Sequence, residues 1–425
     1  MKKLLLLALA LLGAFHPILY AQSANAVHCQ TSEMVETFYQ EHPNARQGAA
    51  NDYLETITKM NRKTLGGDNA PDTFRIAVVF HVYGTIQSGK TINDQLIIGA
   101  VEKLNEDFHG LNSDFNTVHQ NFMQLRAIKN IKFYLAKLDP NGNPTTGIVY
   151  YPAKNGYGTV NAILDAQIQQ DAWDNFSYVN VYIQNDLYGN GATTNSGLAF
   201  YPNTYMTENN LARIVYNGAY LHTNTDPEFA SVLTHEFGHF FNLIHTFESG
   251  CSYPNDLVHD TPPCYSAQGC HSTQNDPGPL NCYGRIINAE NYMDYNASCY
   301  KMFTKGQADR MDTALYLPSR ITLWQDSTII KTGIYTEPEP TNMAKNSLNK
   351  SFELYPNPNN GKLNLQFDPG KTYQVVISNL MGQVIYKNKL NGGANIIDIS
   401  RQAKGIYMLK VSDGANTGAK SFIID

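Results

Sequence analysis

Long apolar segments are almost absent from this chain of 425 residues. The one apolar run near the N-terminus falls short of the ~18 apolar residues that a membrane-spanning helix needs, and no other stretch reaches that length. Charged side chains are also few, at 16% of the residues, and the net charge is −6 with no basic block. This composition argues against nucleic acid as a partner and against an electrostatic anchor on a membrane surface.

The N-terminal apolar run has the pattern of an export signal. Lys2 and Lys3 precede a core of ~12 apolar residues from Leu4 to Phe15, which is too short to span a bilayer. Cleavage is expected after Ala21 or Ala26. We therefore predict a signal peptide over residues 1–21 and a mature protein with no stable transmembrane segment.

Three histidines and one glutamate in a short stretch form the strongest chemical signal. On an α-helix, His235 and His239 lie on one face, so each can place a nitrogen ~2.0–2.1 Å from the same metal ion. Glu236 then flanks the metal without binding it. Because His245 would lie ~9 Å further along an unbroken helix, the helix must end between His239 and His245. Asn242 is the expected break, since asparagine tolerates the left-handed conformation that closes a helix.

The alternative to a metal site is a coincidence of exposed or packed histidines. A random His-acid-x-x-His occurs in a few percent of chains of this composition, and the third histidine lowers this to roughly one in a thousand. A helix is also supported upstream, where Thr225 to Glu228 offers a capping side chain and a first-turn proline. We predict a helix from about Asp226 to Phe241, with an apolar stripe made of Phe229, Val232, Leu233, Phe237 and Phe240.

A methionine about fifty residues downstream completes a known pattern. Met293 lies in the run Asn291 to Tyr295, and histidines followed by such a turn resemble the metzincin clan of zinc endopeptidases. The pappalysin family is the closer resemblance, although it usually has glycine where this chain has Asn242. The resemblance covers most of the middle of the chain, through Ile76–Val82, Leu104–Phe108, Asp139–Pro144, Asp256–Pro262 and Met302–Gln307.

The resemblance implies a secreted zinc metalloendopeptidase that acts on protein or peptide substrates. His235, His239 and His245 would bind zinc and leave a fourth position for water, and Glu236 would be the general base. Met293 would form an apolar floor beneath the metal. Tyr295 would help to stabilise the oxyanion. The competing hypothesis is a non-catalytic surface or adhesion protein, whose structural zinc site would be closed by four protein ligands.

Six cysteines fit an exported protein, although their spacing alone does not determine their connectivity. Four of them surround the methionine turn. The family pattern implies the pairs Cys251–Cys282 and Cys270–Cys299.

Cys29 and Cys264 are left over. Cys29 lies in residues 22–71, which contain a predicted helix from Ser32 to Tyr39 and a Gly/Asn/Asp-rich exit at Gly66–Asp72. Pappalysin propeptides often carry a cysteine whose thiolate occupies the open zinc position, so the resemblance implies that Cys29 is a latency switch in a propeptide. The alternative is a Cys29–Cys264 disulfide.

Calcium is a second candidate metal. Asp256 and Asp260, with the carbonyl groups of Val258 and Thr261, offer hard oxygen ligands, and pappalysins bind calcium in this region. The alternative is ordinary hydrogen bonding of aspartates to their own turns.

The remaining pattern predicts an α+β catalytic domain over residues 72–325, built on a twisted mixed sheet with the active-site helix. Alternating apolar residues predict a strand at Phe74–Val82, and helical spacing predicts a helix that ends at Gly110. Further strands are expected at Ile131–Leu135 and Tyr178–Gln184, with an edge strand at Ser196–Tyr201 and a helix from Thr304 to Leu315.

A second domain follows a linker over residues 326–350, which includes the proline-rich spacer Thr336–Pro340. Residues 351–425 show short strands between Gly/Asn turns, which is typical of a small all-β sandwich. The motifs Leu354–Pro358, Leu380–Gln383 and Gly405–Tyr407 resemble the C-terminal sorting domain of the type IX secretion system of Bacteroidetes. The resemblance implies outer-membrane secretion machinery as a partner and export through the periplasm to the cell surface or medium. The alternative is a carbohydrate- or protein-binding sandwich.

Overall fold

The computed structural model describes residues 29–62, 71–253, 255–267, 269–335, 352–379, 384–413 and 417–425. The chain divides between Ile334 and Tyr335 into two compact units. The predicted signal peptide, the spacer Thr336–Pro340, the motif Leu380–Gln383 and most of the Gly66–Asp72 exit lie outside the described residues.

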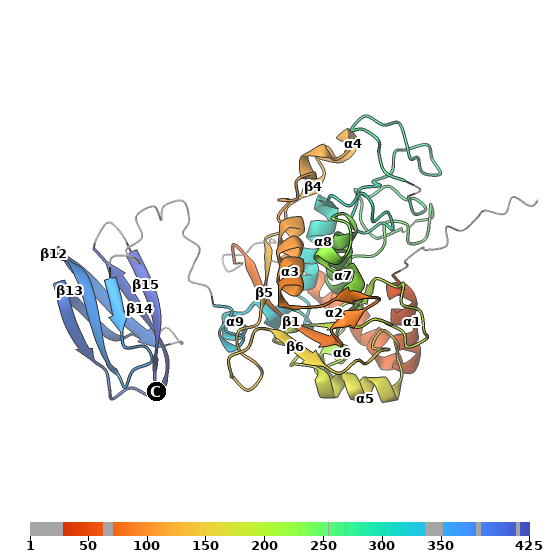
Figure 1. Ribbon diagram of the computed structural model, residues 1–425. Helices are drawn as coiled ribbons and strands as arrows, with labels where there is room; N and C mark the ends of the chain where they lie inside the picture. Colours follow the sequence, from red (N-terminus) through yellow and green to blue (C-terminus); the bar gives the residue numbers. More distant parts are fainter. Residues whose placement is uncertain are drawn as a thin grey trace, which may run out of the picture. The chain divides into compact units, whose positions relative to one another are not determined.

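A mostly parallel sheet lies at the centre of the first unit (Figure 1). Its central strand, β1 (Phe74–Tyr83), pairs in parallel with β5 (Ile131–Leu135), β6 (Ile148–Tyr151) and β7 (Val179–Ile183). Beyond β7 come β9 (Ile214–Tyr216), also parallel, and β8 (Gly197–Ala199), which is antiparallel. The sheet is therefore mixed, as predicted, and β8 lies at its edge.

Helices cover both faces of this sheet. Successive residues of β1 point to opposite faces, so they pack in different buried clusters. Ile76, Val78 and Phe80 pack in the cluster that includes α3 (Asp94–Phe108) and α7 (Val232–Phe240), which lie side by side in Figure 1. The opposite face packs against α5 (Ala162–Asp171) and α9 (Asp326–Lys331). The unit thus has helix, sheet and helix layers.

The boundary of this unit differs from the prediction. Ile329 of α9 and Ile334 are buried with Ala77 and Val79 of the central strand. The predicted linker therefore starts too early, because apolar residues beyond residue 325 complete the core on one face of the sheet.

The N-terminal segment is helical. α1 (Thr31–Glu41) confirms the predicted helix, and α2 (Pro43–Arg62) was not predicted. Val35 and Phe38 of α1 are buried in a cluster with Phe200 and Met206 of the first unit. This segment is therefore part of the folded first unit.

The helix that carries the histidine motif starts later than predicted. Asp226 Oδ1 accepts from Phe229 N at 2.9 Å, which closes a local turn before the 3₁₀ helix η4 (Phe229–Ser231) and then α7. Side-chain hydrogen bonding by aspartate competes with regular helix at such positions. The predicted break is confirmed, because α7 ends at Phe240 and Asn242 is left-handed with φ 73°.

Two guanidinium groups bind carbonyls at the end of α7. Arg320 Nε donates to Phe240 O at 3.1 Å, and Arg310 Nε donates to Asn242 O at 2.6 Å. Cations are favourable at a helix C-terminus because the last carbonyls lack helical partners. Arg310 belongs to α8 (Lys305–Leu315), whose start is fixed by a capping box between Thr304 and Gln307.

Between α7 and α8 the chain has little regular structure. It contains the disulfide Cys251–Cys282, whereas Cys270 and Cys299 are free thiols in the structure. The second implied pair is thus not bonded here, although the Cys270 thiol is close enough to raise the pKa of buried Cys299 further.

The remaining short elements of the first unit lie along its whole length. They are β2 (Ile86–Gln87), β3 (Lys90–Thr91), η1 (Phe115–Thr117), α4 (Gln120–Met123), β4 (Arg126–Ala127), α6 (Thr204–Glu208), η2 (Gly218–Tyr220), η3 (His222–Asn224), β10 (Phe303–Thr304) and η5 (Ile321–Trp324).

The second unit is an antiparallel β structure. Its strands are β11 (Phe352–Tyr355), β12 (Lys362–Asn379), β13 (Val384–Asp398), β14 (Gly405–Ser412) and β15 (Thr417–Ile424). Several predicted short strands are merged into longer ones, because β12 and β13 remain paired across a register shift between Phe367 and Thr372. Leu363, Val375 and Leu409 are among its fully buried residues.

A tight packing contact beneath α7 gives a test of this arrangement. A Cβ on Gly238 would lie 2.4 Å from Met293 Sδ, and Met293 is fully buried. Gly238→Ala should therefore lower the free energy of unfolding of the first unit by about 1–3 kcal/mol through overpacking. Trp173 and Trp324 are the only tryptophans of the chain and both lie in this unit, so urea unfolding followed by tryptophan fluorescence measures the loss. In a Met293→Ala background the same substitution should cost less, and an equal cost in both backgrounds would contradict the proposed contact.

Candidate metal centre

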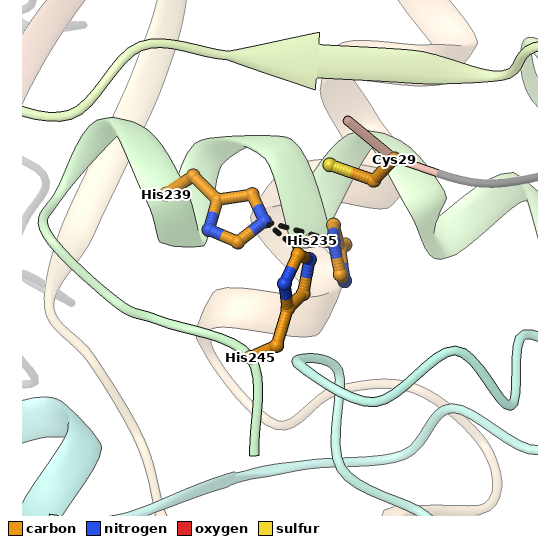
Figure 2. Close-up of side chains that lie close together, drawn as sticks. All are labelled: Cys29, His235, His239 and His245. Atoms are coloured by element: carbon orange, nitrogen blue, oxygen red, sulfur yellow. Dashed lines mark hydrogen bonds between the residues drawn. The ribbon is translucent and has the colours of Figure 1, made fainter. Parts of the chain in front are cut away.

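Three imidazoles converge at the end of α7 (Figure 2). His235 and His239 come from the helix, and His245 comes from the chain that turns back after Asn242. The Nε2 atom of His239 lies 3.0 Å from that of His235 and 3.1 Å from that of His245. With Cys29 Sγ, these atoms form a group in which all lie within 4.8 Å of one another.

The other ring nitrogen of each histidine faces a hydrogen-bond acceptor. His235 Nδ1 lies 2.6 Å from Tyr292 O, and His239 Nδ1 lies 2.7 Å from Leu243 O. His245 Nδ1 lies 3.4 Å from a carboxylate oxygen of Glu248. Because these acceptors cannot donate, the protons lie on Nδ1 and the Nε2 lone pairs point toward one another.

Burial keeps the three rings neutral. It lowers the pKa of His235 to about 4, and it lowers the pKa values of His239 and His245 well below the usual range, helped by the neighbouring histidines. Neutral imidazole is the form that binds a metal. The three rings are therefore ready to act as ligands at neutral pH.

The arrangement fits a tetrahedral zinc ion. Ligands ~2.0–2.1 Å from zinc are about 3.3 Å apart, close to the separations of the Nε2 atoms. Converging lone pairs repel one another in a buried site unless a cation lies between them. All three histidines are at most 2% exposed, so water screens this repulsion little.

Cys29 approaches the histidines from the N-terminal segment (Figure 2). Its thiol donates to Glu236 Oε2 at 3.6 Å, and its carbonyl oxygen accepts a hydrogen bond from the Tyr295 hydroxyl. Burial, and then the Glu236 charge, raise the pKa of the Cys29 thiol. The sequence therefore identified a cysteine that the fold brings to the metal centre, and the alternative disulfide with Cys264 is not formed.

Glu236 is a buried carboxyl group with one bare oxygen. Oε1 has no hydrogen-bond partner among the described residues, and burial raises the pKa of Glu236 well above its usual range. A Cβ on Gly197 of the edge strand β8 would lie 2.7 Å from this oxygen. Only glycine at residue 197 leaves Glu236 room in its present position.

Aromatic rings surround the centre. Phe247 stacks on His245 with ring centroids 4.9 Å apart, and the Tyr295 ring lies 4.7 Å from His245. Met293, the predicted floor, is fully buried against Gly238 below the ligand helix. The fold thus brings together the predicted histidines, Glu236, Met293, Tyr295 and Cys29.

Some residues at the centre were not predicted from the sequence. Tyr300 lies with its hydroxyl 3.5 Å from His235 Nδ1, and Tyr201 packs edge-on to His239. Nothing in the local sequence around either tyrosine indicated that it would lie near the histidines. Glu248 carried such a signal, because a carboxylate three residues after a ligand histidine can reach that ring from the same turn.

The predicted calcium ligands contact one another. Asp256 accepts from the Thr261 hydroxyl at 2.6 Å and from Val258 N at 3.1 Å, and the same hydroxyl lies 3.0 Å from Val258 O. Asp260 accepts from Thr304 Oγ1 at 2.7 Å and from Gly306 N at 2.9 Å, so it caps the start of α8. Asp256 thus makes the local turn hydrogen bonds that were considered as the alternative, whereas Asp260 makes a long-range contact that was not predicted.

Two families match parts of the chain. Residues 162–316 match the family described as pregnancy-associated plasma protein-A, Peptidase M43. Residues 353–425 match the secretion system C-terminal sorting domain.

Curated relatives are fungal extracellular metalloproteases. One from Colletotrichum graminicola is 27% identical over 263 residues, which cover 58% of this chain and 78% of that protein. One from Sordaria macrospora is 35% identical over 141 residues, covering 31% of this chain and 46% of that protein.

Solved structures of mirolysin from Tannerella forsythia are also similar. Mature mirolysin in complex with a cleaved peptide has a TM-score of 0.52 and 28% identity, and the match covers 62% of this chain and 99% of that one. A promirolysin mutant has a TM-score of 0.55 and 26% identity, covering 73% of this chain and 99% of that one. Together with the histidine cluster, these matches show that the chain is a secreted zinc metalloendopeptidase with a Peptidase M43 domain and a C-terminal secretion sorting domain.

Proposed function

We propose that His235, His239 and His245 hold the catalytic zinc and that Glu236 is the general base of peptide hydrolysis. The observation that carries the proposal is the bare Oε1 of a buried carboxyl group beside three converging lone pairs. Zinc at this position would polarise a scissile carbonyl group and acidify a water molecule. A divalent cation nearby also favours the charged carboxylate of Glu236, against the effect of its burial.

The chain's own groups then perform the proton transfers. Glu236 takes a proton from the attacking water and delivers it to the leaving amine. The Tyr295 hydroxyl, which donates to the Cys29 carbonyl, is placed to donate to the carbonyl oxygen of a substrate. Ala199 N, on the edge strand, donates to the Thr31 side chain at 3.1 Å and is a donor that an extended substrate could use instead.

One observation favours the alternative of a structural zinc. Cys29 completes four protein ligands around one point, which is the arrangement of closed structural sites. Glu236 distinguishes the two hypotheses, because a structural zinc site does not require a buried carboxyl group with one bare oxygen, which lowers stability.

Glu236→Ala should keep the fold and the zinc while lowering peptide hydrolysis by on the order of 10²–10⁴, because only the base is removed. Hydrolysis of a denatured protein, with and without a zinc chelator, and zinc content measure the two effects. Glu208→Ala, an exposed carboxylate on α6, is the matched control. Near-normal turnover by a folded, zinc-loaded Glu236→Ala protein would exclude the mechanism.

We infer further that residues 22–71 are a propeptide and that Cys29 is its latency switch. Cys29 occupies the fourth ligand position, and its carbonyl group and Thr31 take the donors that a substrate would use. The coverage of this chain also rises from 62% in the match to mature mirolysin to 73% in the match to its precursor. These contacts support a segment that blocks the centre until it is cut.

Cys29→Ala should raise the activity of the full-length chain severalfold, because it removes the ligand that closes the metal centre. Hydrolysis of a short peptide, with gel analysis to show that the segment is still attached, measures the effect. Cys264→Ala is the control, since Cys264 is a buried free thiol elsewhere. Finding a Cys29–Cys264 disulfide in the active full-length chain would reject this role.

We also propose that Asp256, Asp260 and the carbonyl groups of Val258 and Thr261 bind calcium after a local rearrangement of their turn. Asp256 is fully buried, and burial raises its pKa to about 6. The Arg310 charge lowers this pKa only in part, and the Asp256 carboxylate accepts hydrogen bonds from neutral groups of Val258 and Thr261. A hard cation would offset the cost of burying this charge.

Calcium should raise the Tm of the first unit by several degrees, at roughly 2–4 °C per kcal/mol of linked binding energy. Tryptophan fluorescence during heating, in calcium, in magnesium and in a calcium chelator, measures the shift. Asp256→Asn should abolish it. An identical Tm in calcium and in chelator would show that these residues only close turns.

We infer that residues 353–425 are recognised by outer-membrane secretion machinery. The sorting-domain match supports this partner. Among the described residues, no helix is both long and apolar enough to cross a membrane.

A further inference from the structure

Glu248 contacts both the metal centre and the N-terminal segment. One of its carboxylate oxygens, Oε2, lies 3.4 Å from His245 Nδ1 and accepts from the Ser32 hydroxyl at 3.1 Å. Its side chain is 35% exposed, whereas that of His245 is only 3% exposed. The carboxylate thus lies at the boundary between the buried centre and solvent, under the start of α1.

The three histidines are not held in the same way. Backbone carbonyl groups of Tyr292 and Leu243 orient His235 and His239, so the fold itself fixes those rings. His245 lies on an irregular segment after the helix, and the acceptor at its Nδ1 is a side chain. Its orientation therefore depends on a group that a single substitution can remove.

We propose that Glu248 is the positioning residue of the third zinc ligand and that Ser32 of the N-terminal segment shares its carboxylate. A carboxylate behind a ligand histidine keeps the proton on Nδ1, orients the ring and makes Nε2 more basic. While α1 is in place, Ser32 takes part of the hydrogen-bonding capacity of the same oxygen. Removal of the segment leaves this oxygen to His245. The inference rests on the proposed function, in which His245 binds zinc.

The alternative is that Glu248 only holds α1 in place through its hydrogen bond with Ser32. The two roles differ in what they change. A positioning role changes zinc affinity even when α1 is unaffected. An anchoring role changes only how firmly the segment is held, and Ser32→Ala should then reproduce the loss seen on removing Glu248.

The test measures zinc affinity in the full chain by competition with a chromogenic chelator, in a Cys29→Ala background where only the histidines remain as ligands. Glu248→Ala should weaken zinc binding about 10–100-fold, which is the usual effect of losing such a partner. Glu248→Gln keeps a neutral acceptor of similar volume, so it should recover part of the affinity. Ser32→Ala should not weaken zinc binding, and the exposed-carboxylate control Glu208→Ala should leave zinc affinity unchanged.

Peptide hydrolysis at saturating zinc gives a second readout. Glu248→Ala should lower kcat more than it changes KM, because a misplaced ligand alters the reacting centre more than substrate binding. Unchanged zinc affinity in Glu248→Ala, or an equal loss in Ser32→Ala, would overturn the proposal. Should Glu248→Ala not fold, Glu248→Gln decides: it must show weaker zinc binding than the background chain. Failure of the proposed function is separate, since it would appear as full activity in Glu236→Ala.

Discussion

Three neutral imidazoles directing lone pairs at one point are the constraint on which the rest of the first unit depends. The arrangement needs two ligands on one helix face and a third that returns within six residues. A left-handed Asn242 makes this return, and Arg310 and Arg320 bind the carbonyl groups at the turn. Close packing of Gly238 on Met293 then sets how near α7 lies to the methionine turn. The converging lone pairs are unfavourable on their own, and a cation between them would remove this repulsion.

The N-terminal segment uses the same groups that hydrolysis would need. Cys29 faces the histidines. Its carbonyl group accepts a hydrogen bond from the Tyr295 hydroxyl, and its thiol donates to one oxygen of Glu236. Phe38, on the next helix, is fully buried against the first unit. In the proposed latency, the segment would block the centre by occupying these contacts.

Local sequence accounted for elements whose signals are short-ranged. The strand β1, the helices α1, α3 and α8 and the break at Asn242 follow from apolar spacing and capping residues. The start of α7 did not follow, because the Asp226 side chain closed a turn in competition with the helix. Likewise, the long strands β12 and β13 depend on pairing across a register shift that glycine and proline had hidden.

For the metal centre, the sequence by itself identified the three histidines, the glutamate beside them and the methionine turn. Helical spacing accounts for His235 and His239, the break at Asn242 accounts for His245, and a family resemblance pointed to Met293. Only the tertiary structure decided the groups that meet them from a distance. Cys29 was a candidate, but its place among the histidines depends on how α1 packs. Glu248 had a local signal in its spacing from His245, but its contact with Ser32 depends on the packing of α1. Gly197 is understood only once Glu236 is in position, since its role is a contact with a buried atom and not a local preference.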